Sequence, residues 1–287
     1  MGRSYESRVE KVARHRIGGY REYAPPPETA FFAEALWTHR TPNVDLPRGA
    51  GHRVLPEIAV SVGFDVVRDA DGRPVEGCPL LIGPKLRPQV YTIVPGRELT
   101  AVRLKPEWVG PILGIDPLDA EMQVIDLAAV RPDLARPLHD ALWQTHCAEE
   151  AVAVLASTLL RLRASDCEPT APTTAALDAV RRSEGAWPCE RIADRAGISL
   201  RHLRRQVHDA TGVSPKKYAR TLRLIRSMRI ADGLSRPPWA DVAAAAGYCD
   251  QSHLIRECVA ATGSTPRELH AERRRQIVGV AELSNPV

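Results

Sequence analysis

The sequence predicts an α+β protein in which a mixed α/β N-terminal domain precedes an all-α domain with two helix-turn-helix units joined by a long helix. Three observations predict this fold class. Short β-branched runs separated by turns fill much of the first half of the chain. Apolar residues at three- and four-residue spacing, which is typical of helices, dominate the last third. That last third also repeats itself at an offset of 51 residues, which indicates two copies of one helical unit.

Length and composition set the broad class. The 287 residues suit two domains, and 44% hydrophobic with 26% charged residues is ordinary for a soluble globular protein. No apolar run approaches the roughly 18 residues of a membrane span, and the Arg-rich start does not resemble a secretory signal. The six cysteines lack the spacing of zinc sites or of a disulfide framework. We therefore expect a cytoplasmic protein with no membrane partner, no metal and no cofactor.

The N-terminal elements follow from local patterns. The run Asp69-Ala70-Asp71-Gly72 is typical of a turn. Enrichment in β-branched residues predicts strands at 55–67, 79–82, 89–94 and 99–104. Helical spacing predicts helices at 108–115, 119–125, 131–143 and 148–162.

One apolar stripe closes this first part of the chain. Val152, Leu155, Leu159 and Leu162 recur at three- and four-residue spacing, so they would share a helix face. That face could pack in the core or form a dimer seam. The Pro- and Thr-rich stretch 167–174 predicts a linker between domains at 1–166 and 175–287.

The repeat has the pattern of a helix-turn-helix. Leu203, Gly212 and Pro215 recur as Leu254, Gly263 and Pro266. In each copy a short helix rich in small residues meets a glycine turn, and a capping residue then starts a second helix. The caps would be Ser199 and Asp250, and the two units would span 189–210 and 239–261.

A basic helix is expected between the two units. Residues 216–234 carry two lysines and four arginines, and would hold the units at a fixed separation. Residues 170–275 contain 19 Lys and Arg against 11 Asp and Glu, which favours a polyanionic partner. Two units about 34 Å apart can enter successive major grooves of one duplex, so the sequence predicts that double-stranded DNA is a partner.

The exposed positions of the second helices predict which residues contact DNA. Arginine can bind guanine and glutamine can bind adenine through two hydrogen bonds, whereas most lysine contacts go to phosphates. Arg205 and Arg256 could instead form salt bridges within the domain. The expected base contacts are Arg201, Arg204, Arg205, Gln251, Ser252 and Arg256; the expected phosphate contacts are Ser199, Lys216, Lys217 and Arg267.

About 100 residues resemble the DNA-binding domain of AraC/XylS-type transcriptional regulators. The resemblance lies in Ala196-Gly197-Ile198-Ser199 with Ser214-Pro215, and in Ala246-Gly247-Tyr248 with Asp250-Gln251-Ser252-His253-Leu254. It implies promoter binding and a neighbouring domain that senses a small molecule or dimerises. We expect an activator, while repression stays an open alternative. RNA polymerase and a second copy of the chain are further candidate partners. The sequence departs from the family pattern at three positions. Val207 and Cys258 stand where a larger Phe is usual, and the more polar Ser227 stands where an Ala is usual.

The N-terminal part resembles a sensor-like domain found before such DNA-binding domains. The resemblance covers the runs 31–38, 55–63 and 99–113 with the helical tail. An effector pocket could be lined by aromatic residues, which could equally belong to the core. The candidates are Trp37, Phe64, Tyr91 and Trp108.

Three other functions compete with ligand control of a DNA-binding regulator. A DNA-repair methyl acceptor needs clustered thiolates, yet Cys78 is the only cysteine before residue 147, and no hydrolase or phosphate-loop motif is present. We therefore expect no enzyme. A redox or metal sensor could use Cys147 with His146, or Cys249 with Cys258, although the last two lie roughly 13 Å apart along one helix. Finally, a protein partner could control the N-terminal domain.

Overall fold

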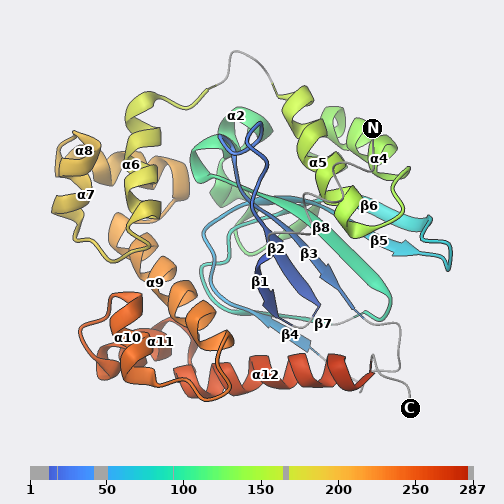
Figure 1. Cartoon of the computed structure of the whole chain (residues 1–287). Coiled ribbons are helices and arrows are strands. Elements are labelled where there is room, and N and C mark those ends of the chain that lie inside the picture. Colours follow the sequence, from blue (N-terminus) through green and yellow to red (C-terminus); the bar gives the residue numbers. More distant parts are fainter. Residues whose placement is uncertain (1–12, 18, 42–50, 93, 164–167, 284–287) are drawn as a thin grey trace.

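A twisted antiparallel sheet forms the centre of the N-terminal domain (Figure 1). The computed structural model describes residues 13–17, 19–41, 51–92, 94–163 and 168–283. The sheet has the order β1-β2-β3-β8-β5-β6-β9, and β4 pairs with β7 in a small second sheet. The strands are β1 (Ala13–Ile17), β2 (Tyr20–Tyr23), β3 (Ala33–Arg40), β4 (Gly51–Val54), β5 (Ser61–Arg68), β6 (Pro74–Ile82), β7 (Gln89–Thr92), β8 (Arg97–Leu104) and β9 (Val124–Asp126).

The two faces of the large sheet differ because side chains alternate along each strand. The register places Leu36, Val62 and Val102 side by side on one face, and all three are fully buried. The next residue of each strand points to the other face, where Trp37, Gly63 and Arg103 lie. The first face is the hydrophobic core, and the second lines a cavity described below.

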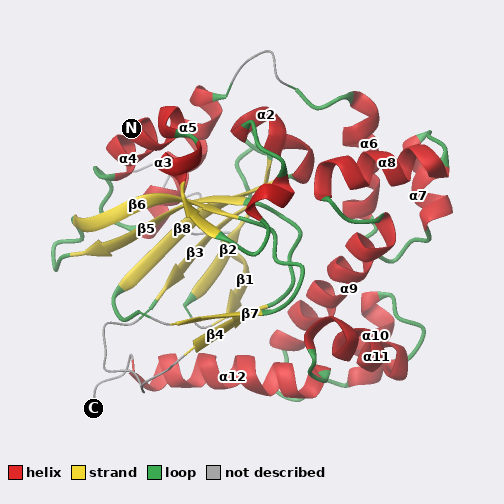
Figure 2. Cartoon of the chain, turned by 180° about the vertical axis from the view of Figure 1, so that it is seen from behind, coloured by secondary structure: helices red, strands yellow, loops and turns green. Residues whose placement is uncertain are grey.

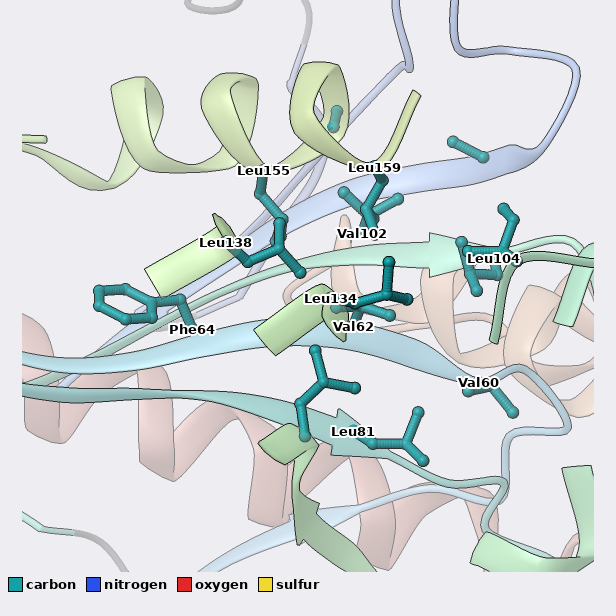
Figure 3. Close-up of a cluster of buried hydrophobic side chains, with 14 of the residues drawn as sticks. Val60, Val62, Phe64, Leu81, Val102, Leu104, Leu134, Leu138, Leu155 and Leu159 are labelled. Atoms are coloured by element: carbon teal, nitrogen blue, oxygen red, sulfur yellow. The ribbon is translucent and has the colours of Figure 1, made fainter. Parts of the chain in front are cut away.

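Helices cover the apolar face. The chain forms a 3-10 helix η2 (Pro106–Trp108), α2 (Val109–Leu113), a 3-10 helix η3 (Pro117–Ala120), α3 (Leu127–Val130), α4 (Pro132–Leu142) and α5 (Ala148–Leu162). Leu134 and Leu138 of α4 and Leu155 and Leu159 of α5 meet side chains of the sheet (Figure 3). The predicted helix at 148–162 is confirmed, and its apolar stripe packs in this core rather than at an exposed seam.

Two expectations for local structure were wrong. Residues 119–125 do not form a helix, because η3 ends at Ala120 and Val124–Asp126 pairs with Leu80–Ile82 of β6. The strand expected at 55–67 begins only at Ser61. Before it, Glu57 makes an isolated bridge to Lys85. In both places pairing with a distant segment decides the structure, and local propensity does not record such pairing.

The C-terminal part is helical throughout, as the sequence predicts. Its helices are α6 (Ala171–Arg182), α7 (Cys189–Ala196), α8 (Leu200–Thr211), α9 (Pro215–Asp232), α10 (Trp239–Ala246), α11 (Gln251–Thr262) and α12 (Pro266–Leu283). Helix α6 begins at Ala171, inside the span that the sequence assigns to a linker. Helix α9 joins the α7–α8 pair to the α10–α11 pair (Figure 2).

The two parts of the chain pack against each other through buried residues. Ile58, which precedes β5, belongs to the same apolar cluster as Leu177, Leu203 and Val207 of the helical part. Leu55 likewise packs against a cluster formed by α9, α11 and α12. The segment between β4 and β5 therefore contributes to two apolar clusters of the helical part.

Candidate nucleic-acid interface

The first helix-turn-helix is built from α7 and α8. Gly197 ends α7 with a φ of 67°, a left-handed conformation that glycine adopts without steric cost. The Ser199 hydroxyl accepts a hydrogen bond from the backbone N–H of His202 at 3.2 Å and so caps α8. Leu203 and Val207 are fully buried on the inner face of α8. The turn and cap that the sequence predicts are therefore present.

The outer face of α8 is basic and exposed. Arg201, Arg204 and Arg205 all lie on it. None of the ion pairs within the described part of the chain uses these three arginines or Arg256. The alternative in which Arg205 and Arg256 anchor salt bridges thus finds no support among the described contacts. The guanidinium groups remain available to a polyanion.

The second unit repeats this geometry in α10 and α11. Gly247 has a φ of 86°, and the Asp250 carboxylate accepts a hydrogen bond from the His253 N–H at 2.6 Å. Leu254 and Cys258 are fully buried, and Cys258 fills the core position that Val207 fills in the first unit. The outward residues of α11 are exposed: Gln251, Ser252 and Arg256.

Helix α9 is held by ion pairs along its length. Arg220 and Arg223 both contact Glu257 of α11, each with a closest N–O distance of 3.0 Å. Arg226 contacts Glu184, and Arg229 contacts Glu22 of β2 at 2.9 Å. Most of the basic residues that the sequence places on this helix therefore fix the neighbouring elements. Reasoning from the sequence missed Glu257, and its only signal was that it is the lone acidic residue of its helix.

The expected phosphate contacts lie near the starts of helices. Ser199 precedes α8, Lys216 and Lys217 lie in the first turn of α9, and Arg267 lies in the first turn of α12. All four residues are exposed. Free backbone N–H groups and the helix dipole favour anions at such ends. The positions thus suit phosphate binding.

A cavity of about 610 Å³ lies on the polar face of the large sheet, and we call it the sheet cavity. Strands β2, β3, β5, β6 and β8 contribute to its wall, and so do Ile225, Met228 and Arg229 of α9. Trp37 and Tyr91, two of the four expected pocket residues, line it. Phe64 and Trp108 do not, because they are buried in the core. Phe64 alternates with the cavity-facing Asp65, so strand parity explains its place.

A buried cluster of charges lies at one side of the sheet cavity. Arg103 donates to Glu22 at 2.7 Å and also pairs with Glu57. Tyr20 donates a further hydrogen bond to Glu22 at 2.7 Å. Burial alone would raise the pKa of Glu22, but Arg103 and Arg229 lower it to about 2. Sequence reasoning missed this cluster, because its members come from β2, β8, α9 and the segment before β5, which are far apart in the sequence.

The cysteines do not resemble a reactive pair. Burial raises the pKa of Cys258 to about 11, and burial also raises the pKa of Cys147, so both thiols stay protonated at neutral pH. Among the residues that the structure describes, no cluster of three His, Cys, Asp or Glu side chains is suited to a metal ion. Within the same residues, no helix has the length and apolar character needed to cross a membrane.

Part of the helical region is similar to known proteins. Residues 192–272 match a family model described as a helix-turn-helix domain. The transcriptional activator RhaS of Escherichia fergusonii is 33% identical over 84 residues, which are 29% of this chain and 30% of the relative. RhaS of Citrobacter koseri is 38% identical over 71 residues, which are 25% of this chain and 24% of the relative. The matches thus span less than a third of either relative.

Two solved structures are also similar. The DNA-binding domain of AdpA in complex with a target DNA is 24% identical, with a TM-score of 0.33; the match covers 37% of this chain and 95% of that domain. ToxT from Vibrio cholerae is 8% identical, with a TM-score of 0.41; the match covers 82% of this chain and 97% of ToxT.

Proposed function

Because the chain carries an AraC/XylS-type helix-turn-helix domain, we propose that the whole protein is a sequence-specific DNA-binding transcriptional regulator. One observation carries the proposal: two capped helices expose arginines or polar side chains outside every described ion pair, while the arginines of α9 are used to position them. Helices α8 and α11 act as recognition helices in successive major grooves. An enzymatic role has no support in this arrangement.

The residues that contact DNA fall into two groups, one for bases and one for phosphates. Arg201, Arg204 and Arg205 on α8 contact base edges, and Gln251, Ser252 and Arg256 on α11 do the same in the second groove. Ser199, Lys216, Lys217 and Arg267 hold the phosphate backbone. Each assignment rests on exposure and on helix position.

A small-molecule effector in the sheet cavity controls the regulator. The support is that α9, which joins the two helix-turn-helix units, forms part of the cavity wall. A bound molecule would contact both the sheet and this helix, so its affinity would differ between arrangements of the two parts. The RhaS relatives are named as activators, which favours activation here. We place the protein in the cytoplasm, with RNA polymerase and a second copy of the chain as further partners.

Selection of genomic fragments on the purified full-length protein tests the proposal. The selected DNA is then footprinted with a probe of the major groove. We expect two protected segments about one helical turn apart, on one face of the duplex. A single protected segment would contradict reading by both units, and uniform protection would contradict sequence-specific binding.

A further inference from the structure

Six cationic side chains line the sheet cavity, and five of them have acidic partners. Arg103 pairs with Glu22 and Glu57, Arg229 with Glu22, Arg97 with Asp65 and Glu76, Arg53 with Glu272, and Arg273 with Asp232. The sixth is Lys85. Among the contacts of the described residues, no carboxylate lies within ion-pair distance of its ammonium group.

Lys85 is also deeply buried. Its exposed fraction is 6%, and its backbone is fixed by two hydrogen bonds with Glu57, of 2.6 and 2.8 Å. Its ammonium nitrogen lies 5.8 Å from the centroid of the Tyr91 ring, which is a weak substitute for a counter-ion. Burial lowers the pKa of Lys85, and the charge of Glu57 opposes this shift from beyond ion-pair distance. A buried ammonium group without a direct acidic partner destabilises a fold. Such a group in a cavity wall is suited to an anion that comes from outside.

We propose that the sheet cavity binds an organic monocarboxylate, whose carboxylate pairs with Lys85 and whose apolar body packs against Trp37, Leu80 and Leu99. This inference rests on the proposed ligand control and names the chemical class of the effector. All four residues line the cavity. Desolvation strengthens a charge-assisted hydrogen bond at Lys85 relative to one in water.

The charges of the wall favour a single negative charge on the ligand. Lys85 is the one described cation of the wall without a carboxylate at ion-pair distance, so one negative charge of a ligand finds a counter-ion and a second, such as that of a phosphate monoester, does not. A neutral alcohol would leave Lys85 without a counter-ion, and an amine would add a like charge beside it. Specificity therefore comes from the one unpaired cation among the described wall residues, together with the apolar surface.

Isothermal titration calorimetry of the full chain with phenylbutyrate and with phenylbutanol tests whether Lys85 binds a carboxylate. These probes share an apolar body and differ in the charged group. We expect the acid to bind at least about tenfold more tightly than the alcohol, the difference that a hydrogen bond to a charged group contributes. Lys85→Met should abolish this preference, whereas Lys85→Arg should retain most of it. Lys105→Met, which changes a lysine outside the cavity wall, is the matched control and should leave the preference unchanged.

Equal affinity for the acid and the alcohol, or no binding of the acid, would overturn the inference. Survival of the preference in a folded Lys85→Met protein would also overturn it. If that variant fails to fold, the affinities of the two probes for the wild-type chain and for Lys85→Arg still show whether the cavity prefers a carboxylate. No DNA is present in this assay, so a negative result beside specific binding of selected DNA would reject the monocarboxylate and leave the proposed regulator standing.

Discussion

At the scale of single residues, similar arginines have opposite roles. Arg205 is exposed on α8 and has no ion pair among the described contacts, whereas Arg223 on α9 contacts Glu257 and the carbonyl of Gly185. In the sequence both are simply basic positions. Only the structure distinguishes the arginine that is exposed and outside every described ion pair from the one that holds neighbouring elements in place.

The first prediction compares Arg205 with Lys217. Arg205→Ala should weaken the binding free energy for DNA with the preferred base pair by about 1 to 3 kcal/mol, because a base contact is lost. It should also relax specificity at that base pair. Lys217→Ala should weaken binding to all sequences alike and reduce the salt slope by about one. Titrations of single-base variants of a selected site at several salt concentrations check both. Uniform weakening by Arg205→Ala would contradict its assignment to a base.

A second prediction concerns Glu22 and acid stability. Its pKa lies near 2 in the folded chain, below the ordinary value of 4.5, so its ionised form stabilises the fold above pH 4.5. That contribution, on the order of 3 kcal/mol by the shift, is lost as the pH falls from about 4.5 to about 2. Glu22→Gln should therefore be less stable than wild type at pH 7, and this difference in the free energy of unfolding should decrease as the pH falls.

Thermal unfolding of both proteins across this pH range measures the gap. Glu76→Gln serves as the control, because Glu76 is largely exposed although it also pairs with an arginine. A gap for Glu22→Gln that stays constant from pH 7 to pH 2 would contradict the account of its ionisation.

At the scale of elements, the sequence predicts what local patterns encode. The helix at 148–162 and both helix-turn-helix units have strong periodicity, turn glycines and caps, so their positions agree closely with the structure. Strand β9 and the start of β5 depend on pairing with β6, β8 and a distant loop, which no local pattern records. Of the expected pocket residues, Trp37 and Tyr91 line the sheet cavity and their role stays a prediction, whereas the side of the sheet that Phe64 faces depends on strand register.

The third prediction tests the ion pairs between α9 and α11. Glu257→Ala removes the shared acceptor of Arg220 and Arg223 and should destabilise the full chain by about 1.5 to 3 kcal/mol, because Arg223 is mostly buried and loses its counter-ion. Denaturant unfolding measures the change. Asp209→Ala on the exposed surface of α8 is the control and should change stability little. Equal effects of the two substitutions would contradict the role of Glu257.

At the scale of the whole molecule, the two parts are coupled by buried contacts. Arg181 of α6 donates to the carboxylate of Glu107 in η2 at 2.5 and 2.7 Å, and the Glu107 side chain is fully buried. With the Arg229–Glu22 pair, this contact joins the sheet domain to α6, the first helix of the helical part, and to α9, the helix between its two units. A ligand bound in the sheet cavity would contact α9, which packs against both α8 and α11.

The fourth prediction uses Arg181 in two contexts. Arg181→Met should destabilise the full chain by about 3 kcal/mol or more, because Glu107 keeps a buried charge without its partner. In the isolated residues 170–287 Glu107 is absent, so the same substitution leaves no buried carboxylate without its partner and should cost under about 1 kcal/mol. Unfolding of both pairs of proteins supplies the comparison. Equal costs in the two contexts would show that Arg181 does not couple the domains.

The most direct test of specific DNA recognition is a titration of the full chain with a selected genomic fragment and its scrambled counterpart at two salt concentrations. The account predicts a specificity ratio above about 10³, with the salt dependence of phosphate contacts on both DNAs. The isolated residues 170–287 are titrated in parallel, because a bound effector could be required to release the helices in the full chain. A ratio near one for both proteins would contradict the account.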